Sequence, residues 1–308
     1  MRPLGIDGIA IALPPGRLVS DLADSVGFGA DTASTLRGNG LSAVPVAETG
    51  PFVDFALESV DRILADFPDA RADVRLVLLA HSAPLLTPGD GNILADLIER
   101  TGLDSAISFA FTGQPCAVLH TAVHWALSAL DDEADGSALV IGADRANHPE
   151  ERFFFGSAMG DASVALLLGR RSERGRILGG HQHTELHASE GEWSAPAAIA
   201  AFRERNPLLI RSGIERCLEQ AGCTLDELAA IVPHTPYLRI WDTVANLLRY
   251  PRERIVTDYI GDTGHLSSND SFVHFHRATL NGHINPGDLV LLVNPGFGGS
   301  RGFTLIRV

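Results

Sequence analysis

A cysteine, Cys116, stands where a Gln-Pro turn gives way to an apolar run with helical spacing. Exposed backbone N–H groups and the positive end of the helix dipole favour an anion at a helix N-terminus, and thiols in such positions ionise more readily than free thiols. The position therefore suits a nucleophilic thiolate. A cysteine that packs as a small hydrophobic residue is the alternative.

The other cysteines do not suggest a metal or disulfide site. Cys217 and Cys223 flank a predicted helix end, so that the chain has an odd number of cysteines without the spacing of metal ligands. We interpret both as packing residues, and we expect no bound metal.

The charge balance excludes several classes of function. The formal net charge is −14, which argues against a general nucleic-acid binder because phosphate contacts need a basic surface. All basic residues are arginine, so lysine Schiff-base chemistry and a P-loop lysine are excluded. No apolar run reaches the ~20 residues that cross a bilayer, and the first residues do not read as a signal peptide. We therefore expect a cytoplasmic protein.

Strands and helices alternate along the chain, which predicts an α/β fold with a sheet covered on both faces. Apolar runs predict strands over residues 4–13, 74–80, 106–110, 137–143 and 162–168. Helical spacing predicts helices over residues 52–67, 92–101 and 116–130. Between them, residues 16–51 show a weak pattern, for which we expect loops and a short helix.

The same order of elements returns after Arg170. Strands are predicted from residue 177 and over residues 228–234, 289–293 and 302–307, and helices over residues 206–221, 238–248 and 268–281. Corresponding strands are ~150 residues apart, which indicates an internal duplication. We expect two related halves, residues 1–170 and 171–308, with a site at their junction.

Five motifs in this order resemble the thiolase superfamily, and in particular its β-ketoacyl-acyl-carrier-protein synthase III-like branch. They are Gln114-Pro115-Cys116-Ala117, Phe155-Gly156-Ser157-Ala158-Met159-Gly160-Asp161-Ala162, Pro233-His234-Thr235-Pro236-Tyr237-Leu238-Arg239-Ile240, Gly261-Asp262-Thr263-Gly264, and the segment from Gly287-Asp288 to Gly298-Gly299. The resemblance implies a five-layered αβαβα fold built from two duplicated halves, and a homodimer.

The resemblance also implies an acyl-enzyme mechanism. Cys116 takes an acyl group from a thioester of coenzyme A or acyl carrier protein, with no bound cofactor, and His234 acts on the second substrate. Gly298 and Gly299 correspond to a glycine loop whose backbone lies close to the acyl site. Arg239 stands where synthase III enzymes carry a basic residue for docking of the acidic carrier protein, and a solvated helix face with scattered charges is the alternative reading.

The sequence departs from the condensing enzymes at Asp262, where their motif has Gly-Asn-Thr. An ionised aspartate only accepts hydrogen bonds, so it would oppose the enolate that decarboxylation of a malonyl thioester must form. An aspartate beside a histidine instead fixes the imidazole tautomer and stabilises the imidazolium. Cys116, His234 and Asp262 would then form a Cys-His-Asp triad. A turn-capping role for Asp262 is the alternative.

Two nearby residues leave the identity of the partner of His234 open. Asn269 could face His234 in place of Asp262, which would favour condensation, although a place at a helix N-terminus suits it better. His265, which follows the Gly-Asp-Thr-Gly loop, could line the site.

These residues favour an acyltransferase that passes an acyl group from Cys116 to a hydroxyl or amine, in specialised metabolism of the polyketide or fatty-acid type. A decarboxylative enzyme that forms carbon–carbon bonds is the second hypothesis. A weakly active partner subunit of a heterodimeric condensing enzyme is the third.

Overall fold

Within the described residues, nine strands form one hydrogen-bonded sheet in the order β11-β12-β13-β10-β1-β9-β6-β4-β5. The computed structural model describes residues 4–48, 50–82, 92–130, 136–154, 156–171, 175–185, 194–234, 236 and 238–308. Of the sequence motifs, Phe155, Thr235 and Tyr237 lie outside these residues.

The elements of the first half and their bounds follow the predicted alternation. They are β1 (Gly5–Ala12), α3 (Phe52–Asp66), α4 (Ala70–Asp73), β4 (Val74–Ala80), α5 (Ile93–Thr101), β5 (Ile107–Phe111), α6 (Val118–Leu130), β6 (Ser137–Asp144) and β9 (Ala162–Gly169). The second half contains β10 (Arg176–Thr184), α7 (Pro196–Ala221), β11 (Leu228–Pro233), α8 (Leu238–Leu248), α9 (Ile260–Thr263), α10 (Asp270–Leu280), β12 (Leu289–Pro295) and β13 (Ser300–Arg307).

The strand arrangement occurs twice. In the first half β4 pairs with β6 in parallel, whereas β6–β9 and β9–β1 are antiparallel. In the second half β11 pairs with β12 in parallel, whereas β12–β13 and β13–β10 are antiparallel. The two series meet where Gly5 of β1 pairs with Arg176 of β10. This repeat places β6 and β12, and with them the segments that follow, at corresponding positions.

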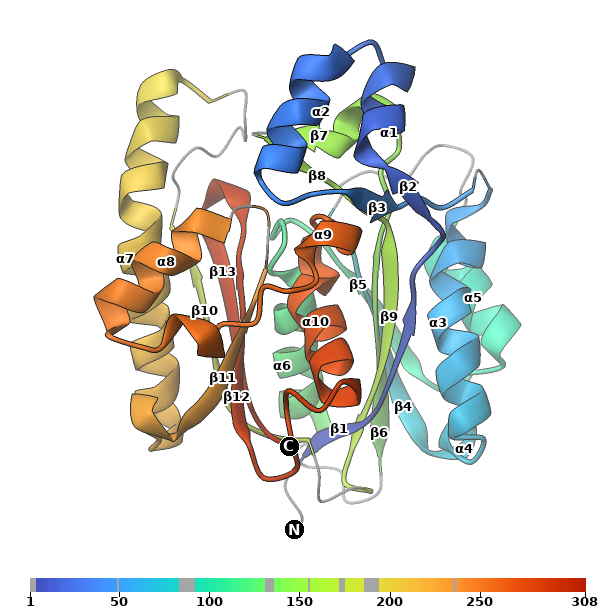
Figure 1. Ribbon diagram of the computed structural model, residues 1–308. Coiled ribbons are helices and arrows are strands. Elements are labelled where there is room, and N and C mark those ends of the chain that lie inside the picture. Colours follow the sequence, from blue (N-terminus) through green and yellow to red (C-terminus); the bar gives the residue numbers. More distant parts are fainter. Residues whose placement is uncertain are drawn as a thin grey trace.

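Helices cover the two parts of the sheet on both faces, which gives five layers (Figure 1). Helices α3 and α5 pack on the outer face of the first part, and α7 and α8 on that of the second. Helices α6 and α10 lie between the two parts and share one hydrophobic core with both. The expected five-layered α/β fold is confirmed, while the domain boundary at residue 170 stays a prediction.

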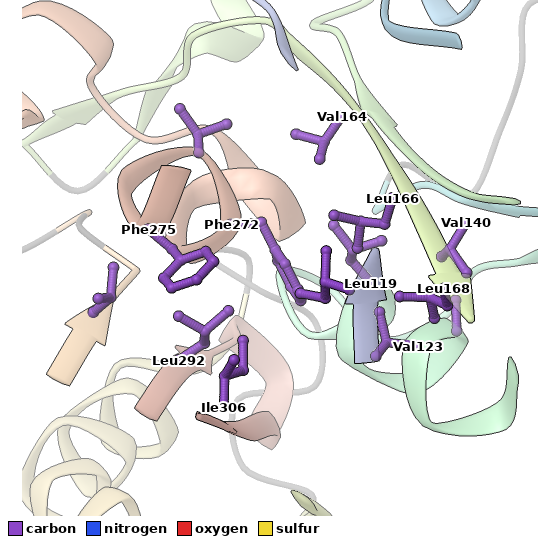
Figure 2. Packing of buried hydrophobic residues seen from close by; sticks show 14 of the residues in the cluster. Leu119, Val123, Val140, Val164, Leu166, Leu168, Phe272, Phe275, Leu292 and Ile306 are labelled. Carbon is purple, nitrogen blue, oxygen red and sulfur yellow. The ribbon is translucent and has the colours of Figure 1, made fainter. Parts of the chain in front are cut away.

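The central layer is apolar because each of its helices buries residues toward both parts of the sheet. Figure 2 shows Leu119 and Val123 of α6 beside Val140 and Leu168, and Phe272 of α10 between Leu119 and Phe275. Each of these side chains is fully buried. Burial of a large apolar side chain stabilises a fold by about 1.5–3 kcal/mol, so this layer fixes where the N-termini of α6 and α10 lie.

Residues 16–51 are more regular than expected, because they form β2 (Gly16–Leu18), α1 (Val19–Ser25), α2 (Gly29–Gly38) and β3 (Ala43–Pro45). Together with β7 (Phe153–Phe154) and β8 (Ser157–Ala158) they lie over the ends of the central helices (Figure 1). Helix α7 begins ten residues before the predicted start and contains Pro207 in its interior. Among the described residues, the structure has no helix long and apolar enough to cross a membrane.

Candidate active site

Cys116 lies at the junction of the two halves, two residues before α6 rather than within it. Its φ is 62°, a left-handed conformation that is uncommon for a residue with a side chain. Its backbone N–H donates to Ser82 Oγ (3.2 Å), and its carbonyl accepts from Asn294 Nδ2 (2.8 Å). The predicted helix start at Cys116 is therefore wrong by two residues, since these hydrogen bonds hold its backbone out of the helix.

The sulfur of Cys116 faces an imidazole, that of His265. Cys116 Sγ and His265 Nε2 are 3.3 Å apart, and His265 Nδ1 lies 2.5 Å from Asp270 Oδ2. The other oxygen of Asp270 accepts from the backbone N–H of Leu266 at 2.7 Å. All three side chains are buried. The structure thus contains a linear Cys-His-Asp arrangement, in which the carboxylate fixes the imidazole and the imidazole faces the thiol.

Backbone pairing holds His265 in place. Its N–H donates to the carbonyl of Ala158 (2.9 Å), and its own carbonyl accepts from Gly160 (3.0 Å). Gly264 precedes it with φ 59°, and a Cβ there would lie 2.4 Å from the carbonyl oxygen of Ala158. Only glycine fits this approach, so the Gly-Asp-Thr-Gly loop serves to present His265.

The electrostatics of this arrangement favour a charged His265. Burial alone disfavours the imidazolium, but the negative charge of Asp270, the nearby Cys116 and the hydrogen bonds to both outweigh it and raise the pKa of His265 to about 10. Burial opposes the charged form of Asp270, but the charge of His265 and its hydrogen bond outweigh this effect and lower the pKa of Asp270. A protonated His265 directs a hydrogen-bond donor, its Nε2–H, at the sulfur of Cys116.

His234 lies beside this group at the end of β11, with its ring edge-on to the ring of His265 at a centroid distance of 4.5 Å. Its N–H donates to the carbonyl of Val293 (2.8 Å), and its carbonyl accepts from Trp241 Nε1 (3.1 Å). Burial, and then the charge of His265, lower the pKa of His234 well below its usual value. His234 is therefore an uncharged imidazole at neutral pH.

Asp262, the predicted partner of His234, lies elsewhere. Its side chain is 60% exposed on α9, and its carboxylate accepts from Arg277 at 2.8 Å and 3.3 Å. The expected contact between Asp262 and His234 is therefore wrong, because the short helix α9 directs this carboxylate to the surface. The carboxylate beside the imidazole of His265 belongs to Asp270.

Asn269, which the sequence offered as the alternative partner of His234, makes its hydrogen bonds elsewhere. Its Nδ2 donates to Asp144 (3.2 Å) and to the carbonyl of Ala162 (3.3 Å). These contacts direct its amide toward the first half of the chain. Asn269 does precede α10 as expected, but its side chain does not cap that helix.

The predicted glycine loop approaches a neighbouring segment. Gly299 lies against the backbone of Glu185, where a Cβ would meet the carbonyl oxygen at 1.6 Å. It is Gly296 that approaches the nucleophile segment, since a Cβ there would meet the carbonyl oxygen of Pro115 at 1.7 Å. Roles for Gly298 and Gly299 in acyl binding stay predictions. Arg239 is exposed in the first turn of α8.

A cavity of about 450 Å³ opens beside the site between α2 and β7. Phe28, Thr32, Thr35, Phe153 and Phe154 contribute to its lining. The ring of Phe154 also packs edge-on to that of His265, at a centroid distance of 5.6 Å. Phe154 thus forms part of the cavity wall and also contacts His265.

Among the described residues, one group could hold a metal by its geometry, and it is Cys116, His234 and His265, whose potential ligand atoms lie within 4.8 Å of one another. Cys116 and His265 belong to the contacts that lead from the thiol to Asp270, and His234 lies beside them. We interpret the group as an acid–base and nucleophile set, because Asp270 orients His265 toward sulfur.

Comparison with known proteins finds synthase III enzymes among the relatives of this chain. Residues 218–308 match the family model for the C-terminal part of 3-oxoacyl-acyl-carrier-protein synthase III. The β-ketoacyl-acyl-carrier-protein synthase III of Thermosynechococcus vestitus is 27% identical over 282 residues, which cover 83% of each chain.

Solved structures establish the fold. The acyltransferase ChlB3 superposes with a TM-score of 0.87 at 22% identity, covering 99% of this chain and 98% of that chain. The 3-oxoacyl-acyl-carrier-protein synthase III of Pseudomonas aeruginosa gives a TM-score of 0.82, also at 22% identity and with the same coverage. The chain is therefore similar over most of its length to β-ketoacyl-acyl-carrier-protein synthase III enzymes, and it has their fold.

Proposed function

We propose that the protein is an acyltransferase that loads an acyl group from a thioester of coenzyme A or acyl carrier protein onto Cys116 and passes it to a hydroxyl or amine. The observation that carries this proposal is the buried sequence of contacts from Cys116 through His265 to Asp270, with an uncharged His234 beside it. The likeness in fold to the acyltransferase ChlB3 is consistent with it.

In the loading step, the Cys116 thiolate attacks the thioester carbonyl and forms a new carbon–sulfur bond. The bond to the donor sulfur breaks, and the leaving thiolate takes the proton of His265. His265 is then neutral, so that one of the influences that lower the pKa of His234 is removed. Loading thereby makes His234 a stronger base for the second step.

In the transfer step, the acceptor oxygen or nitrogen attacks the acyl carbon while His234 takes its proton. The bond to Cys116 breaks and the thiolate returns. The proton on His234 passes to His265, whose ring lies 4.5 Å away, and this restores the starting pair of thiolate and imidazolium. Two imidazoles thus give one base for the acceptor and one partner for the thiolate.

Decarboxylative condensation is the second candidate, because the relatives are named as β-ketoacyl synthases. That reaction needs hydrogen-bond donors at a developing enolate. Here the Asn269 amide is bound elsewhere and a buried carboxylate, Asp270, lies beside the imidazoles. Release of carbon dioxide from a malonyl thioester, against transfer of a simple acyl group to an alcohol or amine, separates the two.

The edge strand β5 supports a homodimer. It ends the sheet and presents Ile107 and Phe109 with 60% and 45% of their surface exposed, beside Trp125 of α6, whose ring packs on that of Phe109. Exposed apolar edges of this kind are normally covered. A second copy of the chain fits, because two β5 strands could pair across a two-fold axis and bury both apolar rows.

An acyl carrier protein could dock near Arg239. Arg239, Arg249 and Arg254 are exposed on and after α8, whereas Arg252 is bound to Asp242 (2.7 Å). An acidic partner is attracted by exposed arginines despite the net negative charge. Loading rates of Arg239→Glu with a carrier-protein thioester and with a coenzyme A thioester test this, since only the former should fall.

A further inference from the structure

Two buried polar side chains lie behind the nucleophile, outside the sequence of contacts from thiol to carboxylate. Asp144 ends β6, and Asn294 lies near the end of β12. They are 1% and 0% exposed. Because β6 and β12 occupy corresponding positions in the two halves, these side chains approach the junction from opposite sides.

Asp144 accepts hydrogen bonds from three residues. Its Oδ1 accepts from the Ser82 N–H (2.6 Å), and its Oδ2 accepts from Ser82 Oγ (3.2 Å), the Ser268 N–H (3.1 Å), Ser268 Oγ (2.7 Å) and Asn269 Nδ2 (3.2 Å). With its hydroxyl proton directed to Asp144, Ser82 Oγ is free to accept the Cys116 N–H at 3.2 Å. The carboxylate therefore fixes the acceptor that holds the amide of the nucleophile.

Asn294 donates hydrogen bonds to backbone carbonyl groups. Its Nδ2 donates to the carbonyl oxygens of Cys116 (2.8 Å) and Ser268 (3.1 Å), with that of Ser267 at 3.5 Å. The N–H and the C=O of Cys116 are thus both held, the first through Ser82 and the second by Asn294. Asp144 and Asn294 also hold the segment of the second half that contains Ser267 and Ser268.

The two segments held in this way share an unusual backbone. Cys116 has φ 62° and Ser267 has φ 54°, and each shortly precedes a central helix, α6 or α10. They lie about 150 residues apart, as corresponding parts of a repeat would. Left-handed conformations of residues with side chains persist only where the surroundings impose them. The hydrogen bonds from Asp144 and Asn294 supply that constraint.

We propose that Asp144 and Asn294 are positioning residues for acyl transfer. By holding the Cys116 backbone against the segment that contains His265 and Asp270, they set the 3.3 Å distance between Cys116 Sγ and His265 Nε2. This inference rests on the proposed role of Cys116 as the nucleophile.

Alkylation of Cys116 by iodoacetamide, followed by peptide mass spectrometry across pH 6 to 9, tests the proposal without an acyl substrate. If position matters, Asp144→Asn should slow alkylation at pH 6.5 by about tenfold, and the rate should then rise with pH as for an ordinary thiol. If Asp144 acted only through its charge, its removal would favour the thiolate and speed alkylation. Other ionisable groups that face this region, His81, His234, His265 and Asp270, are unchanged.

Ser82→Ala is the milder variant, because Asp144 keeps its donors from Ser268, Asn269 and the Ser82 backbone. It should show the same change of profile, and Ser82→Thr, which retains the hydroxyl, should restore the original one. Ser163→Ala is the matched control, since it removes a buried serine hydroxyl that lies 2.6 Å from Ser59 and does not contact the nucleophile.

Asp144→Asn and Ser82→Ala profiles that both match the unaltered protein, or that both show faster alkylation at pH 6.5, would overturn the inference. Failure of the proposed function looks different. In that case the unaltered protein and Ser163→Ala would show the expected alkylation, but no acyl group would appear on Cys116 after exposure to thioesters.

Discussion

Replacing Asp270 by asparagine tests how the nucleophile is activated. The carboxamide has the shape of the carboxylate and can still accept from the Leu266 N–H, but it loses the charged contact with His265 Nδ1 at 2.5 Å. A hydrogen bond to a charged group contributes about 1.5–3 kcal/mol, so loading of Cys116 at pH 7 should slow by about 10- to 100-fold.

The assay is a single-turnover reaction with an acyl thioester, in which intact-protein mass spectrometry follows the acyl-enzyme. Asp262→Asn is the matched control. Asp262 lies shortly before Asp270 in the chain, but it is an exposed carboxylate that pairs with Arg277. It should load at the unaltered rate. Normal loading by Asp270→Asn, or impaired loading by Asp262→Asn alone, would refute the assignment of the carboxylate.

Four further outcomes follow from the same geometry. His234→Gln should load Cys116 normally but slow transfer to an alcohol by about 10²- to 10⁴-fold, as chase experiments on the acyl-enzyme would show; equal loss of both steps would contradict separate roles. Because the pKa of His265 is raised to about 10, its ring should stay an imidazolium as pH rises from 6.5 to 9, as NMR of the ring would show, whereas in Asp270→Asn the ring should lose its proton within this range. Phe109→Asp should convert a dimer into a monomer in analytical ultracentrifugation, and an unchanged dimer would place the interface elsewhere. Phe272→Ala should lower the free energy of unfolding by about 3–5 kcal/mol in denaturant titrations, since this ring fills the central layer.

Much of the fold was predictable because strands buried on both faces leave a strong apolar signal. Strands β4 and β6 and helix α8 begin where the apolar pattern begins. Weakly patterned residues gave poorer predictions. Helices α1 and α2 contain many small and polar residues, and the few apolar residues that they bury, such as Leu22 and Leu36, belong to a small hydrophobic cluster with Ile260.

The site was predictable only in part, since a resemblance in motif gives the residue types but not their directions. Cys116 and His234 are placed at the junction as expected. The carboxylate was assigned to Asp262 because it occupies the motif position, yet α9 directs it outward. Asp270 carried a weak signal, an acidic residue five positions after His265 at the start of a helix, which only the turn through Ser267–Asn269 converts into a contact.

The central claim is that Cys116 forms an acyl-enzyme and delivers its acyl group to an alcohol or amine. Intact-protein and peptide mass spectrometry after exposure to a panel of acyl thioesters, followed by a chase with alcohols and amines, tests it most directly. The account predicts an acyl mass on the Cys116 peptide that disappears in the chase as an ester or amide is formed. Absence of acylation at Cys116, or discharge only onto a malonyl thioester with release of carbon dioxide, would contradict it.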